Sequence, residues 1–215
     1  MRFALLLAAA SAASLSLAGP AAAHPHVWVK SKAVILYDTS GRVAGIRHGW
    51  TFDEAYSAYA VQGFPTGPDG KLAPEKMAEL AKINVESLAD QGFFTSAKAN
   101  GQKVGFGEAV NYKTSFENNV LTLTFDLPLS SPAKADRAFT LEVYDPTFFV
   151  EFAIAAGDDA VQLEGAPKGC ALNVTRPKPQ DPAQTPSVSE SFFNALSAAS
   201  QYGAQFASRV LVACP

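Results

Sequence analysis

The chain has 215 residues, of which 48% are hydrophobic and 17% charged, and its formal net charge is −3 with histidine neutral. The length suits one domain of moderate size or two small ones, and the apolar content supports a real hydrophobic core. No cluster of Lys and Arg is present, which argues against nucleic acid as a partner and against binding to an anionic membrane surface.

The first predicted element is a secretory signal peptide over residues 1–23. Arg2 precedes an apolar run from Phe3 to Leu17, which is followed by Gly19-Pro20 and Ala21-Ala22-Ala23. A membrane anchor needs roughly 18 or more uninterrupted apolar residues, and this run is shorter and leads to a small-residue cleavage site. We expect cleavage after Ala23, a periplasmic location and no membrane insertion of the mature chain; a retained N-terminal anchor is the alternative.

A β-hairpin is the next predicted element. Residues 26–37 and 43–52 are rich in β-branched and aromatic side chains, and Asp38-Thr39-Ser40-Gly41 between them has turn chemistry. Asp53 then stands as an N-cap before a short helical pattern that runs to Ala60. A second helix is expected from Pro74 to about Asp90, ended by Gly92.

The remainder of the chain is predicted to be mostly extended. Expected strands cover residues 102–111, 120–127 and 139–155, the last bent at Asp145-Pro146. A proline-rich linker over residues 176–182 precedes an aromatic stripe that indicates a terminal helix over residues 189–208. The prediction is an α+β fold: one β-rich domain over residues 24–215 with an N-terminal hairpin, two or three helices and a C-terminal helix.

The two cysteines, Cys170 and Cys214, are expected to form a disulfide. They are the only cysteines, and export would place them in an oxidising compartment. Such a bond would tie down the C-terminal segment. A pair of thiolate metal ligands is the alternative, although no CxxC spacing is present.

The mature N-terminus is the main candidate for a metal site. Cleavage after Ala23 exposes His24-Pro25-His26, with one free amine and two imidazoles in three residues. Nitrogen donors suit zinc, copper, nickel and cobalt. Because Pro25 has no N–H, the square-planar chelate that uses the second residue's deprotonated amide is blocked. A clamp of histidine and amine, or a site completed by a carboxylate, remains; an uninvolved N-terminal tail is the alternative.

The hairpin predicts which carboxylates lie near this terminus. A turn at residues 39–41 places Trp28 opposite Thr51, Phe52 or Asp53, so Asp53 and Glu54 lie at the same end as His26. His48 falls about 20 Å along the strand from His26 and is expected to be a surface or half-buried residue, not a ligand. Asp145 is a further candidate, either as a ligand or as a turn residue.

Several segments carry a resemblance to one family. These segments are His24-Pro25-His26-Val27-Trp28-Val29 after a signal peptide, Trp50-Thr51-Phe52-Asp53-Glu54, Tyr144-Asp145-Pro146-Thr147-Phe148-Phe149, and Gly169-Cys170. Together they resemble the family called domain of unknown function 1007, over nearly the whole mature chain. Members are described as periplasmic components of ABC-type transport systems and often accompany nickel/cobalt-type permeases, which implies metal handling.

The function expected from these observations is that of a periplasmic accessory protein, not an enzyme. It would bind a divalent transition metal (zinc, nickel, cobalt or copper) for a membrane metal permease. The expected ligands are His24, His26, Asp53, Glu54 and Asp145. Two alternatives stay open: a metal-independent interaction scaffold, and a copper enzyme with an N-terminal histidine clamp. No nucleophile elbow or HExxH motif supports hydrolase chemistry.

Overall fold

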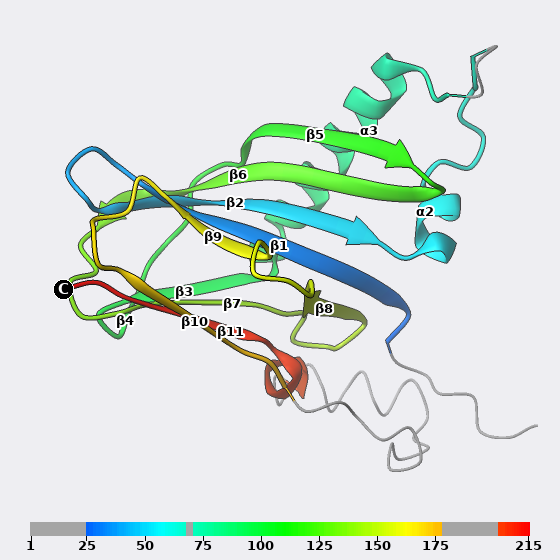
Figure 1. Ribbon diagram of the computed structural model, residues 1–215. Helices are drawn as coiled ribbons and strands as arrows, with labels where there is room; N and C mark the ends of the chain where they lie inside the picture. Colours follow the sequence, from blue (N-terminus) through cyan, green and yellow to red (C-terminus); the bar gives the residue numbers. More distant parts are fainter. Residues whose placement is uncertain (1–24, 68–70, 178–201) are drawn as a thin grey trace, which may run out of the picture.

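The computed structural model describes residues 25–67, 71–177 and 202–215 and consists mainly of two β-sheets (Figure 1). The first sheet has the order β5-β6-β2-β1-β8, and β9 also pairs with β1. Its strands are β1 (Val27–Tyr37), β2 (Val43–Phe52), β5 (Val110–Glu117), β6 (Val120–Ala133), β8 (Val150–Ile154) and β9 (Val161–Glu164). The second sheet has the order β10-β11-β7-β3-β4. Its strands are β3 (Thr95–Ala99), β4 (Gln102–Lys103), β7 (Phe139–Val143), β10 (Ala171–Thr175) and β11 (Arg209–Ala213).

Two α-helices, α2 (Glu54–Ala60) and α3 (Pro74–Ala89), and two short 3₁₀ helices, η2 (Gly92–Phe94) and η4 (Tyr202–Phe206), complete the described elements. Both α-helices were predicted at these places. Helix α3 packs beside β5, where the Thr114 hydroxyl donates to the Met77 carbonyl over 2.6 Å. In the described residues, no helix is long and apolar enough to cross a membrane.

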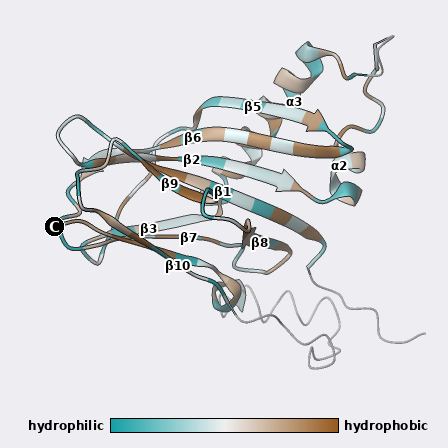
Figure 2. Cartoon of the chain, viewed as in Figure 1, coloured by the Kyte–Doolittle hydropathy of each residue, from teal (hydrophilic) through white to brown (hydrophobic). Residues whose placement is uncertain are grey.

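The hydrophobic core lies between the two sheets. Along β6 every second residue from Leu121 to Leu129 is buried, which is the alternation of a strand with one covered face. Figure 2 shows this alternation as hydrophobic and hydrophilic bands along the strands. The rings of Phe93, before the second sheet, and Phe125, from the first, lie 5.7 Å apart. Burial of these aromatic side chains against one another stabilises the contact between the sheets.

The N-terminal hairpin has the predicted pairing. Lys30 lies opposite Thr51 and Ser31 opposite Trp50 in an antiparallel register. The backbone N–H of Asp53 donates to the Trp28 carbonyl over 2.9 Å, so Trp28 and Asp53 face each other, as one of the predicted registers requires.

The predicted single strand over residues 139–155 is wrong. Residues 139–143 form β7 in the second sheet, and residues 150–154 form β8 in the first, where it runs parallel to β1. The segment Tyr144–Phe149 carries the chain between the sheets, and Phe148 there has a left-handed φ of 57°. Since parallel neighbours come from distant parts of the chain, local periodicity contains no signal for this crossover.

The predicted fold class also needs correction. The described residues contain two α-helices, and their C-terminal part holds η4 followed by strand β11, which pairs between β7 and β10. The predicted helix over residues 189–208 therefore fails at its described end; its earlier part lies outside the described residues. Tyr202 and Phe206 pack with Phe148, and an added Cβ on Gly203 would lie 1.7 Å from the Asp145 carbonyl oxygen. Among the described aromatic residues of this stripe, Tyr202 and Phe206 thus belong to a cluster with Phe148 of the crossover segment. The predicted strand over residues 102–111 is also interrupted: β4 ends at Lys103 and β5 begins at Val110.

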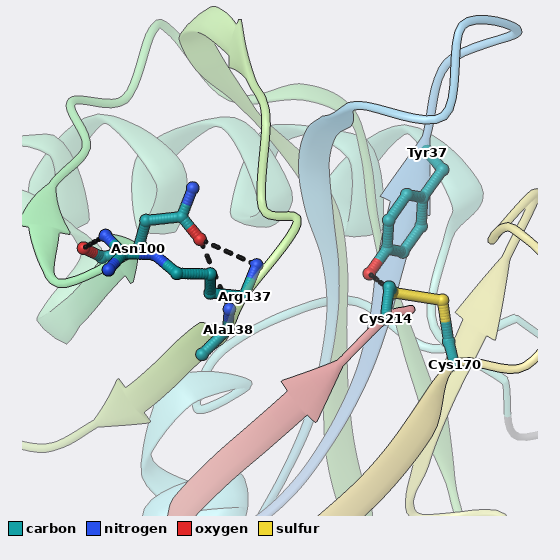
Figure 3. The surroundings of a disulfide bond; sticks show 6 residues. All are labelled: Tyr37, Asn100, Arg137, Ala138, Cys170 and Cys214. Atoms are coloured by element: carbon teal, nitrogen blue, oxygen red, sulfur yellow. Dashed lines mark hydrogen bonds between the residues drawn. A yellow bond between two sulfur atoms is a disulfide. The ribbon is translucent and has the colours of Figure 1, made fainter.

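Cys170 and Cys214 form the expected disulfide, with an S–S distance of 2.09 Å. Figure 3 shows this bond joining the neighbouring ends of β10 and β11, with the Tyr37 ring beside it. The Tyr37 hydroxyl lies 3.8 Å from the Cys214 sulfur, and burial raises the pKa of this phenol. The disulfide therefore fastens the last strand to β10, and the contact with Tyr37 places this bond beside the far end of β1.

Candidate functional site

His26 lies at the entrance to β1, next to the crossover before β8. Its backbone N–H donates to the Phe149 carbonyl over 2.9 Å, and its ring lies 4.7 Å from the Phe149 ring. Both side chains are exposed. The backbone of this predicted ligand is thus held against the sheet while its imidazole lies at the surface. His24, the other predicted ligand of this pair, lies outside the described residues.

Asp53 joins the end of β2 to the start of α2. One carboxylate oxygen accepts the N–H of Tyr56 over 2.9 Å and thereby caps the helix. The other accepts the N–H of Trp28 over 2.9 Å. Both oxygens of the predicted third ligand therefore hold backbone groups. Glu54 follows at the first turn of α2, and its side chain is exposed.

Asp145 organises the turn between the two sheets and is 5% exposed. Its Oδ1 accepts the backbone N–H and the hydroxyl of Thr147, each over 2.8 Å. Its Oδ2 accepts the N–H of Val150 over 3.0 Å. Of the two roles left open for Asp145, these contacts are those of a turn residue, since an Asp side chain commonly binds the backbone two residues further on.

These predicted residues gather at one end of β1 without forming a shared cage. Asp53 contacts the backbone of Trp28, and Asp145 contacts Val150, which lies opposite Val27. Within residues 25–67, 71–177 and 202–215, no group of three or more His, Cys, Asp or Glu side chains is arranged to hold a metal ion.

Glu151 is the acidic residue of this end that the sequence did not indicate. It lies on β8 directly opposite Trp28. Glu151 is half-buried, and this burial raises the pKa of its carboxyl, although the neighbouring Trp28 side chain opposes the shift. Only the parallel pairing of β1 with β8 brings Glu151 to this end of the sheet. Because this pairing joins segments far apart in the sequence, no local pattern indicates it.

His48 is buried in the core, with 1% of its surface exposed, and not at the surface or half-buried as predicted. It lies opposite Ala33 and stacks on Phe125 with ring centroids 4.9 Å apart. Thr95 donates its hydroxyl hydrogen to the Phe93 carbonyl, so its oxygen can accept from the His48 Nε2–H at 3.4 Å. Burial lowers the pKa of His48 to about 3, against the opposing charge of Asp126. His48 is therefore a neutral core residue.

A hollow of about 520 Å³ lies at the other end of β1, beside the hairpin turn and the disulfide. Its two cations each have a carboxylate partner: Arg42 contacts Asp38 at 3.2 Å, and Lys134 contacts Asp136 at 2.8 Å. Local carboxylates thus compensate the basic charge of this hollow, which offers no strong preference for an anion.

Comparison with known protein families assigns the chain to one family. A family model described as a protein of unknown function, DUF1007, matches residues 9–214. No curated protein matches the chain. The matched span takes in both sheets, the N-terminal histidines and both cysteines, and the chain therefore belongs to the DUF1007 family.

Proposed function

We propose that this protein is an exported, periplasmic accessory protein that binds one divalent transition-metal ion at its mature N-terminus for a membrane metal transporter. The observation that carries the proposal is the placement of His26. Its imidazole is exposed, while its backbone is held at the start of β1 by the Phe149 carbonyl. Fixing a ligand before the metal arrives lowers the entropy lost on binding.

The donor chemistry supports a nitrogen-rich site. A chain that begins at His24 offers its α-amine and the His24 imidazole for one chelate ring, and His26 adds a second imidazole. Pro25 lacks the amide hydrogen that the common N-terminal copper and nickel chelate must lose. Zinc, nickel, cobalt and copper all accept imidazole ligands. Amine and imidazole bind metals as neutral groups, so affinity is expected to fall on acidification.

The test is titration calorimetry with Zn²⁺, Ni²⁺, Co²⁺ and Cu²⁺ on protein exported by its own signal peptide, after mass spectrometry of the N-terminus. We expect a chain beginning at His24 and one metal per chain. The variants His24→Ala and His26→Ala should each lose most of the affinity. His48→Leu is the matched histidine control and should bind like the wild type, because His48 is a buried core residue.

Two results would contradict the proposal. A mature chain that starts beyond His26 would lack both ligands. Equal binding by the wild type and the His24→Ala/His26→Ala double variant would favour the metal-independent scaffold instead.

A further inference from the structure

The outer face of the first sheet brings a carboxylate to His26. On β1 the side chains of Val27 and Val29 are buried and Trp28 is exposed, so the alternation places His26 on the same outer face as Trp28. On β8, Phe152 is buried and its neighbour Glu151 points to the opposite, outer face. Since β1 and β8 are parallel and Glu151 is opposite Trp28, Glu151 is the diagonal neighbour of His26.

This diagonal is a workable span for a metal ion. Adjacent strands are about 4.8 Å apart and two residues rise about 6.6 Å, so the two Cα atoms are separated by roughly 8 Å. Diagonal neighbours at this separation are within reach of long side chains. Metal–nitrogen and metal–carboxylate distances near 2.0–2.2 Å fit between an imidazole and a glutamate that lean toward each other.

The other carboxylates at this end are less suited to the role. Both oxygens of Asp53 and both oxygens of Asp145 accept backbone N–H groups that hold a helix start and a turn. Glu54 lies on α2, outside the strand pair. Glu151 lies opposite Trp28, whose indole N–H can donate to a carboxylate but cannot itself bind a metal ion. A hydrogen-bond donor beside a metal ligand commonly orients that ligand.

We propose that Glu151 supplies the carboxylate ligand of the N-terminal metal site, diagonal to His26, with the Trp28 indole as the group that orients it. This inference rests on the proposed function. It replaces Asp53 as the third side chain and places one ligand of the site on strand β8. A pair of imidazole and carboxylate ligands suits Zn²⁺ or Co²⁺.

The test compares Zn²⁺ binding by the wild type, Glu151→Gln and Glu54→Gln in the mature protein. The two variants make the same chemical change at the same end of the sheet. Removal of a group that only orients a metal ligand commonly costs about 10–100-fold in affinity, so Glu151→Gln should weaken binding at least tenfold. Glu54→Gln should stay within about twofold of the wild type, as expected for a surface change away from the site.

A spectroscopic measurement separates a ligand from a structural residue. The visible absorption of bound Co²⁺ depends on its ligands, so at saturating metal the band of Glu151→Gln should shift while that of Glu54→Gln should not. Thermal unfolding of each variant without metal checks that Glu151→Gln is folded. Trp28→Phe, which keeps Glu151 and loses its donor, should leave the Co²⁺ band close to that of the wild type.

The failure of this inference differs from the failure of the proposed function. If His24→Ala and His26→Ala lose binding but Glu151→Gln keeps the wild-type affinity and Co²⁺ band, the assignment of Glu151 is wrong and the histidine site stands. If the histidine variants bind as the wild type does, the proposed function itself is wrong.

Discussion

The hairpin contains two His-x-Trp segments, His26-Val27-Trp28 and His48-Gly49-Trp50, with opposite environments. Trp28 is 51% exposed and Trp50 is 1% exposed. The register explains the difference: Ser31 lies opposite Trp50, so even-numbered side chains point outward on β1 and inward on β2. A slip of one residue would exchange the faces of one strand. The same residue pattern therefore provides an exposed histidine and tryptophan on one strand and core packing on the next.

The largest expected effect on stability comes from replacing each of the two tryptophans in turn. Trp50 contacts the rings of Phe125 and Phe152 with centroids 5.0 and 4.8 Å away. Trp50→Ala should lower the free energy of unfolding by about 3–5 kcal/mol, as large-to-small changes of aromatic core residues do. Trp28→Ala should lower it by no more than about 1 kcal/mol, since exposed positions contribute little. Urea denaturation measures both, and similar losses would contradict the assignment of faces.

A second test uses pH and the two histidines. The pKa of His48 is about 3 in the folded state, below its ordinary value of 6.5, because the ring is buried. Between pH 3 and pH 6.5, His48 is protonated in the unfolded chain but neutral in the folded protein. The free energy of unfolding therefore keeps its full His48 contribution above pH 6.5 and falls as the pH drops toward 3. The His48 contribution to this slope is about 1.4 kcal/mol per pH unit.

The measurement compares urea denaturation at pH 7 and pH 4.5 for the wild type, His48→Leu and His26→Ala. His48→Leu should show a clearly smaller loss of stability on acidification than the wild type, whereas His26→Ala should retain the wild-type loss. A wild-type pH dependence in His48→Leu would mean that His48 titrates in the fold as it does in the unfolded chain.

The smallest expected effect concerns Asp53, which sits opposite Trp28. Asp53→Ala removes both the N-cap acceptor and the acceptor of the Trp28 N–H and should cost about 1–2 kcal/mol. Asp53→Asn keeps one acceptor oxygen for the cap but loses the bond from Trp28, so it should cost less than Asp53→Ala but more than zero. Thermal unfolding of the two variants gives both values. Neither variant should weaken Zn²⁺ binding as much as Glu151→Gln does; a larger loss in Asp53→Asn would return Asp53 to the metal site.

Local signals allowed the hairpin and both helices to be predicted. Asp38 accepts the backbone N–H of Ser40 and of Arg42 in the turn, Asp53 caps α2, and Pro74 begins α3. Each of these residues acts on neighbours a few positions away, so its effect is visible in a short window of sequence.

The missed elements depend on distant partners. Strands β9 and β10 are short, and they are defined by pairing with β1 and β11. The same holds for the site: the exposure of His26 and the position of Asp53 near Trp28 follow from the hairpin, but Glu151 reaches this end only through the parallel pairing of β8. Whether Asp145 was a ligand or a turn residue depended on its contact with Val150, which the misread strand concealed.

The position of β1 in its sheet also sets an order of events in folding. Strand β1 is synthesised first, and its hairpin partner β2 follows at once, but its other neighbours, β8 and β9, come from the second half of the chain. As long as those residues are absent, one edge of β1 lacks its partners and can pair with another chain. Pairing between residues so far apart in the sequence also slows folding. A chain truncated before residue 150 should therefore be prone to aggregation, and the N-terminal strand should be among the last to acquire its native neighbours.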